Sequence, residues 1–382
     1  DIDKLINIVT KGRYRIATFV NSTTVTLSGS PTTGTGLTWN IGGAVVTIGA
    51  ILANATGAFV SGDTCYIGAG TYREVVTVGI TSPVAETQII GDVTGQFTGD
   101  AGDVIWTAYT TDDISAPTAT ATITLAGRDF LTFRNILIIG GNATPSCVIA
   151  TTTNSINIVF RDCAFICTTL SGACISYTGL ADIAANWTID RCRFIGGTAG
   201  NAIQLTLPTS ASADYDSNFL VQNCSFTGTW ANLVSVGVNG TAAFKAGGVD
   251  MFNCTGIGRT SAFNVTSASI STTIPCLVYN NVLYTGAGTT LIAASTGQIV
   301  EDFNRLLSNS PRSNVTAGAS SVADTTHAIM VEFGYGDISG RLSRPWGMPM
   351  ANSPLLGRPS ASSGTPTVDV WNRPRPSGGN SA

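Results

Sequence analysis

One sequence pattern recurs seven times between residues 130 and 310 of this 382-residue chain. Each copy has an alternating apolar and polar stretch, then a polar residue that is most often Asn or Asp, as in NIVFRDCAFICT at 157–168. The residues that follow this Asn/Asp position are spaced by 27, 29, 32, 30, 27 and 24 positions: Ile136, Cys163, Cys192, Cys224, Cys254, Asn281 and Arg305. A period of about 30 residues indicates a solenoid, in which each repeat forms one coil.

A second short apolar stretch follows each of these positions, for example CISYT at 174–178 and AIQLT at 202–206. Alternation with a period of two predicts strands. Helical periodicity and capping signals are missing between the stretches, so helical and leucine-rich repeats fit poorly. We therefore predict an all-β parallel β-helix whose coils stack about 4.8 Å apart, with every side chain above its equivalent in the next coil.

This stacking gives the cysteines a structural interpretation. Cys163, Cys192, Cys224 and Cys254 form one predicted file, and Cys147 and Cys174 begin another. Nine cysteines is an odd number, no Cys-x-x-Cys pair occurs, and one histidine, His327, is present. A disulfide framework or a zinc site is therefore the weaker alternative. Free cysteine packs as a small apolar residue, so we expect buried, stacked thiols and no metal or cofactor.

The polar positions of the repeat also predict contacts between coils. Arg161-Asp162 in one coil is expected above Asp190-Arg191 in the next. The charge order is reversed between them, which predicts ion pairs across about 5 Å. The Asn/Asp position predicts a ladder at a turn, because Asn tolerates left-handed backbone and its amide can bond neighbouring coils. Its expected members are Asn135, Asp162, Asn223, Asn253, Asn280 and Asn304.

Composition narrows the classes of partner. Charged residues make up 11% of the chain, the net charge is -4, and only three lysines occur. No basic patch for phosphate backbones is present, so we do not expect a nucleic-acid partner. No run reaches the roughly 18 consecutive apolar residues of a membrane span, so we do not expect membrane insertion. The chain begins at Asp1 without the pattern of a secretory leader, which we interpret as processing or as an excerpt.

Two further segments carry a family resemblance. SGDTCYIGAGTYREVVTV at 61–78 resembles the first-coil signature of the right-handed parallel β-helix superfamily, the pectate-lyase-like fold. SPLLGRPSASSGTPTVDVWNRPRP at 353–376 is similar to its closing segment, with Asn372 where Gly is usual. The resemblance covers residues 50–376 and implies a right-handed β-helix, similar to non-catalytic phage, virion or secreted surface members. It specifies fold rather than function.

These observations divide the chain into three parts. Residues 1–49 read as two strands and a Gly/Thr-rich link, similar to the leading segment of large phage and bacterial β-helix proteins. We expect this small β cap to shield the first coil from end-to-end pairing, with a short turn of helix near 44–54. Residues 50–307 are expected to form the β-helix. Residues 308–382 are expected to be irregular, to pack along the column and to end in a closing strand.

Catalytic residues are harder to find. Inverting glycosidases need two carboxylates about 6.5 to 9.5 Å apart, and Asp214 with Asp216 is the weak candidate pair. Polysaccharide lyases need a base beside calcium-binding acids, and no position offers an Asp cluster beside a Lys. SRPWG at 343–347 and GVDMF at 248–252 resemble elements of pectin methylesterases, but the glutamine-bearing partner motifs are missing.

Two aromatic residues are candidates for glycan contacts. We expect Trp187 and Trp230 to be exposed and able to stack on sugars. Packing in the core or at an interface is the more favoured alternative.

The economical hypothesis is a structural or adhesive protein without catalysis, on the surface of a virus particle. It would be a capsid decoration, tail spike or fibre subunit, assembled as a homo-oligomer with other structural proteins and in contact with glycans. The alternatives are a secreted or cell-surface bacterial adhesin or filament subunit, and a polysaccharide-degrading lyase, hydrolase or esterase. The expected location is the virion surface or the extracellular side of a cell.

Overall fold

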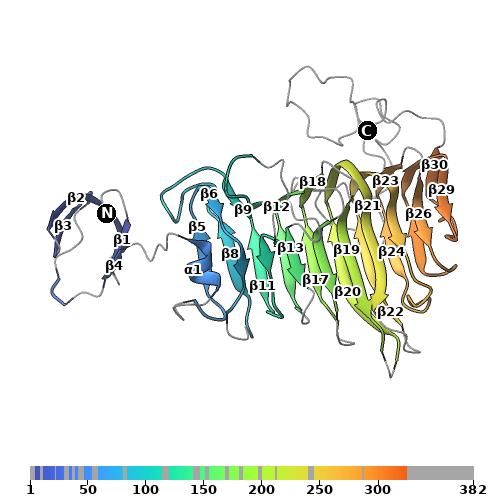
Figure 1. Ribbon diagram of the computed structural model, residues 1–382, viewed down its shortest axis with the longest axis horizontal. Coiled ribbons are helices and arrows are strands. Elements are labelled where there is room, and N and C mark those ends of the chain that lie inside the picture. Colours follow the sequence, from blue (N-terminus) through green and yellow to red (C-terminus); the bar gives the residue numbers. More distant parts are fainter. Residues whose placement is uncertain are drawn as a thin grey trace, which may run out of the picture.

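The computed structural model describes residues 5–324, apart from short gaps, and residues 325–382 lie outside the described part. The gaps are 9–11, 22, 30–33, 37–38, 42–46, 54–58, 81–83, 114–119, 141–146, 151–154, 168–171, 180–183, 197–199, 211–212, 240–244 and 286–287. The described chain is almost entirely β-structure and forms a long column of stacked coils (Figure 1). No helix in this part of the chain is long and apolar enough to cross a membrane.

The first face of the column is a parallel sheet of nine strands, one from each coil. Successive strands pair in parallel along its whole length. The strands are β5 (Thr64–Ile67), β8 (Thr87–Gly91), β11 (Leu131–Arg134), β14 (Ile158–Arg161), β17 (Trp187–Asp190), β20 (Tyr215–Gln222), β22 (Ala246–Phe252), β24 (Cys276–Tyr279) and β27 (Ile299–Asp302).

The other strands form a single 17-stranded sheet that bends into two further faces. The second face contains β6 (Gly70–Arg73), β9 (Val104–Thr107), β12 (Leu137–Gly140), β15 (Ala164–Cys167), β18 (Arg193–Gly196), β25 (Val282–Thr285), β28 (Arg305–Leu307) and β30 (Val322–Asp324). The third contains β7 (Val76–Thr77), β10 (Ile123–Thr124), β13 (Val148–Ala150), β16 (Ala173–Thr178), β19 (Asn201–Pro208), β26 (Thr289–Ala293) and β29 (Ser310–Ser313). Two long strands, β21 (Ser225–Asn239) and β23 (Thr255–Val265), run along both faces.

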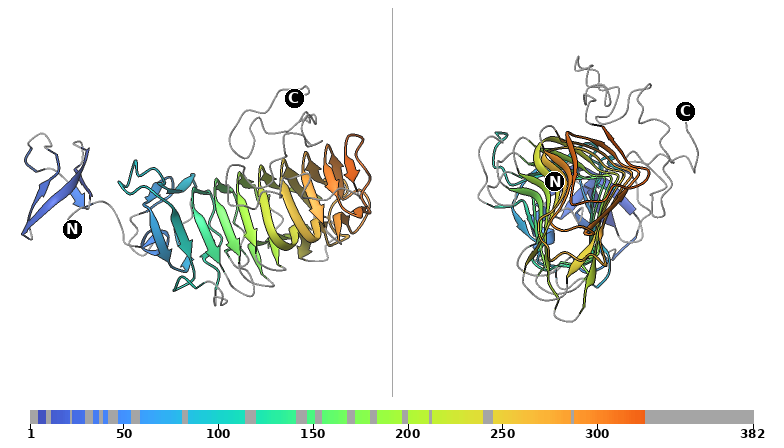
Figure 2. Two further views of the ribbon diagram at one scale, coloured as in Figure 1. Left: turned by 90° about the horizontal axis from the view of Figure 1, so that it is seen from above. Right: turned by 90° about the vertical axis from the view of Figure 1, so that its right-hand side faces the viewer.

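The predicted parallel β-helix is therefore confirmed, with three strands per coil where the sequence showed two. Viewed along the column, equivalent strands of successive coils superpose (Figure 2). The inward side chains stack as like on like, as in the file Phe165, Phe194 and Phe226, whose ring centroids are 4.9 and 4.8 Å apart. These aromatic and aliphatic residues form one continuous core.

Parallel pairing continues past residue 307, where we expected an irregular segment. β29 pairs with β26, and β30 pairs with β28. The described column therefore extends to Asp324. The closing motif at 353–376 and the 343–347 element lie outside the described residues, as does His327.

The N-terminal segment contains an antiparallel sheet of four strands in the order β3-β2-β1-β4. These are β1 (Leu5–Ile8), β2 (Gly12–Asn21), β3 (Thr24–Leu27) and β4 (Trp39–Ile41). The sheet has a small core of its own around Ile6 and Ile16. Figure 1 shows it apart from the column, at whose N-terminal end lies the short helix α1 (Ile48–Leu52).

Helix α1, which lies within the stretch 44–54 where a short turn of helix was expected, covers the core at the first coil. Ile48 and Leu52 are buried in the core of the column. Thr47 caps the helix by accepting a hydrogen bond from the Ala50 amide at 3.1 Å. The Glu74 carboxylate accepts from the amides of Ile48 and Gly49 at 2.7 and 2.8 Å, which fixes the helix to the first coil.

Candidate functional site

Four cysteines form the predicted file, and each lies just after a first-face strand in one of four successive coils. They are Cys163 after β14, Cys192 after β17, Cys224 after β20 and Cys254 after β22. Each is at most 2% exposed. Their Sγ atoms lie within hydrogen-bonding distance of carbonyl oxygens in the preceding coil: Cys163 to Phe133, Cys192 to Phe160, Cys224 to Ile189 and Cys254 to Val221, at 3.5, 3.5, 3.5 and 3.7 Å. Burial raises the pKa of the Cys163, Cys192 and Cys224 thiols well above the ordinary value, so the thiols are neutral S–H donors.

All nine cysteines are free, and every one except Cys65 is buried. Burial raises the pKa of Cys65 to about 11, so its reactive thiolate is scarce at neutral pH. Among the described residues, no three His, Cys, Asp or Glu side chains converge to hold a metal ion. The thiols therefore serve as small apolar core residues that also satisfy backbone carbonyls.

We predict that a thiol reagent at pH 7 labels the native protein slowly, with Cys65 reacting first. The buried thiols should react only after denaturation, because neither reagent nor hydroxide reaches them. Mass spectrometry of labelled peptides over time measures this order. In Cys65→Ser the first phase should disappear. Early labelling of two or more file cysteines would contradict their placement in the core.

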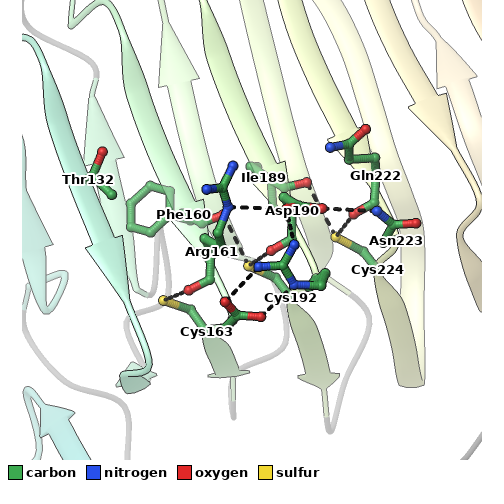
Figure 3. Close-up of polar contacts among 12 residues, drawn as sticks. Thr132, Phe160, Arg161, Cys163, Ile189, Asp190, Cys192, Gln222, Asn223 and Cys224 are labelled. Atoms are coloured by element: carbon green, nitrogen blue, oxygen red, sulfur yellow. Dashed lines mark hydrogen bonds and ion pairs between the residues drawn. The ribbon is translucent and has the colours of Figure 1, made fainter. Parts of the chain in front are cut away.

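An ion-pair network lies beside the thiol file, at the end of β14 and β17 (Figure 3). Arg161 Nε is 3.2 Å from Asp190 Oδ2, and Arg191 binds Asp162 through Nε and Nη2 at 2.7 and 2.8 Å. Arg191 Nη1 also binds Asp190 Oδ2 at 2.8 Å. The reversed charge order read from the sequence therefore forms pairs between coils.

Asp190 is the centre of this network. It is 2% exposed, and the Asn223 amide donates to its Oδ1 at 3.0 Å from the following coil. The hydrogen bonds with Asp162 raise the pKa of Arg191, with further contributions from the charges of both aspartates. The network thus ties three coils together through one buried carboxylate.

The Asn/Asp ladder lies at the turn between the first and second faces. The backbone is left-handed, with φ between 52° and 57°, at Asn135, Asp162, Arg191, Asn223, Asn253 and Asn280. Asn304 does not belong to this ladder. Arg305 pairs with Val282, which places Asn304 above Asn281, and Phe303 takes the left-handed position with φ 58°. The alignment of the last coil was one residue too long.

Asn281 and Asn304 instead continue the thiol file with side-chain amides. The Cys254 amide donates to Asn281 Oδ1 at 2.8 Å, and the Asn281 amide donates to Asn304 Oδ1 at 2.9 Å. Their Nδ2 groups donate to the carbonyls of Met251 and Val278 at 2.9 and 2.6 Å. The same file of positions therefore holds thiols in four coils and side-chain amides in the next two, and both kinds of group contact the backbone of a neighbouring coil.

A second asparagine ladder, which the sequence reading missed, lies at the start of the first-face strands. Asn186 donates to Asn157 Oδ1 at 3.1 Å, and Asn218 donates to Asn186 Oδ1 at 2.8 Å. All three have left-handed backbone. Their spacing of 29 and 32 residues equals that of the thiol file, so the repeat alignment contained the signal.

Trp187 and Trp230, the candidates for glycan contact, are fully buried. Trp187 stacks on Phe219 with ring centroids 5.4 Å apart, and its Nε1 donates to the Ser155 carbonyl at 2.7 Å. A Cβ on Gly196 would lie 2.4 Å from the Trp230 ring, which shows how closely that indole is packed. The favoured interpretation, packing in the core, is confirmed for both residues, and the alternative of glycan contact is wrong because they point into the core.

The candidate pair Asp214 and Asp216 lies at the start of β20, and the two carboxylates have different surroundings. Asp214 accepts hydrogen bonds from the Lys245 amide, Ser271 and Thr273 at 2.8, 2.7 and 2.8 Å. The Ser271 bond, followed by those from Lys245 and Thr273, lowers the pKa of Asp214. This carboxylate is therefore ionised and used to bind neighbouring coils.

Asp216 is exposed, and its Oδ1 accepts from the Asn218 amide at 2.7 Å. A Cβ on Gly248 would lie 1.7 Å from that oxygen, so the carboxylate lies directly against the glycine in the next coil. Two residues further along β22 is Asp250, which the sequence reading did not select. Burial, together with the charge of Asp216, raises the pKa of Asp250 to about 6, against one hydrogen bond from the Leu277 amide.

Asp250 predicts a specific pH dependence of stability. Its folded pKa of about 6 lies above the ordinary 3.8, so folding favours the protonated form. Stability should therefore fall as the pH rises from about 4 through 6. In Asp250→Asn the protein should be more stable than wild type above pH 6, by at most about 3 kcal/mol.

Urea unfolding at several pH values measures the effect. Near pH 3 the two proteins should be similar in stability, because wild-type Asp250 is then largely protonated in both the folded and the unfolded state. Asp112→Asn, at a fully exposed carboxylate, is the control. It keeps Asp250, so its difference in stability from wild type should not grow as the pH rises through 6. A constant difference at all pH values would contradict the assignment to titration.

Comparison with known proteins assigns the chain to no family. No protein-family model matches the chain, and no curated protein matches it. A solved structure of pectate lyase Pel9A aligns with a TM-score of 0.48 and 15% sequence identity, over 85% of this chain and 90% of that one. The parallel register of the strands defines the class, which is an all-β parallel β-helix. At 15% identity, the activity of that lyase is not assigned to this chain.

Proposed function

We propose that the chain is a structural or adhesive subunit on the surface of a virus particle, as a capsid decoration, tail spike or fibre component. The main support is that many of its polar side chains bond neighbouring coils to one another. The ion-pair network, the Asn157, Asn186 and Asn218 ladder, the amides of Asn281 and Asn304, and Asp214 bind one coil to another. A chain whose polar side chains are engaged in this way is suited to resist unfolding and to present a long surface.

The mechanical argument follows from the pairing pattern. Every strand of the first face between the end strands β5 and β27 pairs with both neighbours, so no inner coil can open without breaking two rows of backbone hydrogen bonds. The stacked core adds buried apolar area in proportion to column length. Such a column keeps its shape outside a cell without a bound ligand. We propose a homo-oligomer that assembles with other surface proteins and contacts glycans.

Immunogold labelling of the native source with an antibody against the folded column tests this function. We expect gold at regular positions on virus particles. Labelling of cell surfaces or filaments would favour the alternative, a bacterial adhesin or filament subunit. Labelling confined to the soluble extracellular fraction, with none on particles or cells, would overturn both structural roles.

A glycan-cleaving enzyme is the second candidate, and one observation favours it. Asp250, with a pKa raised to about 6, lies near exposed Asp216. A protonated acid beside an ionised carboxylate is the combination that glycosidases require. Both come from the outer side of the first face, where a long polymer could bind along the coils.

This alternative is tested by incubation with polygalacturonate, alginate and capsular glycans, followed by assays for reducing ends and unsaturated products. If the chain is an enzyme, Asp216→Asn and Asp250→Asn should each abolish product, while Asp112→Asn should leave it unchanged. Absence of product from every polymer would leave the structural role as the supported function.

A further inference from the structure

The outer surface of the second face carries a row of apolar side chains. In β12, β15 and β18 the core residues alternate with half-buried residues that point outward. Ile139 pairs with Ile166, and Ile166 with Ile195. Beyond a register shift after Phe226, the row continues from Thr227 through Ile257 and Tyr284 to Leu307, which is itself buried. We name these residues the isoleucine stripe: Ile139, Ile166, Ile195, Thr227, Ile257, Tyr284 and Leu307.

The neighbouring outward row is also apolar in part, with Ile105, Leu137 and Ala164 in consecutive coils. The third face is different. Its outward row is polar at most positions and apolar at two: Thr124, Ile149, Ser176, Gln204, Ser235, Asn264, Ile292 and Ser313. The two faces belong to one sheet, so the difference is one of sequence and not of backbone geometry.

Parallel sheets that are apolar on both surfaces are covered on both. A row of apolar side chains that water still reaches in part is otherwise a site of association. The stripe is one to two side chains wide and is flanked by exposed Arg193. A stable interface between two copies needs about 800 Å² per partner, which is much wider than this row. A single extended segment fits its width.

The chain itself supplies such a segment. The last described strand, β30, lies on the second face, and its Asp324 pairs with Leu307 at the end of the stripe. Residues 325–382 therefore begin where the stripe ends. They include three of the four methionines, Met330, Met348 and Met350, together with Trp346 and Trp371. Covering the seven coils from β12 to β28 needs about nine extended residues, far fewer than this segment holds.

We infer that part of the C-terminal segment 325–382 lies along the isoleucine stripe and buries it. The apolar side chains of the segment replace water over the β-branched row, and its attachment at Asp324 gives it a high effective concentration there. The surface that remains for partners is then the first face and the third face, whose outward row is polar at most positions.

Site-specific photo-crosslinking tests this placement in the full-length protein. Benzoylphenylalanine at position 166 or 195 should form a crosslink to a peptide within 325–382 of the same chain. The matched control at Gln204, exposed on the third face, should not. A mixture of isotopically light and heavy chains separates crosslinks within one chain from crosslinks between two. Crosslinks between copies, or no excess over Gln204, would overturn the inference.

A protease measurement gives an independent readout. Within 325–382 every arginine except Arg341 precedes proline, so trypsin has one efficient site there. Ile166→Glu with Ile195→Glu should increase the rate of cleavage after Arg341 by about tenfold, because the segment is released more often. Gln204→Glu should not change the rate. Equal rates in all three proteins, with the column still folded by circular dichroism, would also overturn the inference.

Discussion

Replacing Trp187 with alanine should lower the free energy of unfolding by about 3 to 5 kcal/mol, the usual cost of removing a large buried aromatic side chain. The indole is completely buried and stacks between coils on Phe219. Its Nε1 also satisfies the Ser155 carbonyl, which would lose its partner. Chemical denaturation followed by circular dichroism measures the change.

Arg193→Ala is the matched control for this substitution. Arg193 is exposed at the start of β18, in the same coil as Trp187, and its removal should change stability by no more than about 0.5 kcal/mol. A loss below about 1 kcal/mol for Trp187→Ala would mean that the indole is not in the core, and the glycan-contact hypothesis would have to be reopened.

Asp190→Ala should cost about 3 kcal/mol or more, because it removes one partner of a buried ion pair. Arg161 and Asn223 would lose their contacts with this carboxylate, and Arg191 would keep Asp162 alone. Denaturation at pH 7 and low salt measures the loss. Arg161→Ala provides the comparison, since its side chain is 39% exposed and its pair should contribute at most about 1 kcal/mol. Similar costs for the two substitutions would contradict the central role of Asp190.

The register of the column could be predicted because the contacts that define it repeat. Cys163, Cys192 and Cys224 are aligned by spacing alone, and the same alignment predicts the Arg161 and Asp190 contact. A fixed register also determines which residues face inward, since side chains alternate along each strand. The fold and most of its polar contacts therefore followed from periodicity.

Features that do not repeat from coil to coil could not be predicted from the periodicity of the sequence. The coil of β8 was not recognised as a repeat because a long insertion separates it from β11. That insertion is organised by Asp92, whose carboxylate accepts from the amides of Gln96, Phe97 and Thr98 at 3.1, 2.7 and 2.7 Å. Although burial acts to raise it, the pKa of Asp92 is lowered by these bonds and by those from threonine hydroxyls. Nothing in the repeat pattern marks such a turn.

The errors at single residues have a similar cause. Side chains alternate between the two sides of a strand, so an error of one position in where the strand begins exchanges inside and outside. This alternation decides whether Trp187 and Trp230 point into the core. Asp250 was overlooked because its raised pKa arises from burial and from Asp216 in the neighbouring coil. Such an environment is a property of the folded column and has no signature in the local sequence.

The reversed charges at the end of β14 and β17 also limit how the chain can wind. Repeats of similar sequence can be assembled with one turn omitted, and the apolar layers alone would tolerate that mistake. If the turn that carries Asp190 were skipped, Gln222 and Asn223 would meet Arg161 and Asp162, and both charges would lose their counterions. Complementary charges on consecutive turns thus make the correct order of winding lower in free energy than an order that omits one turn.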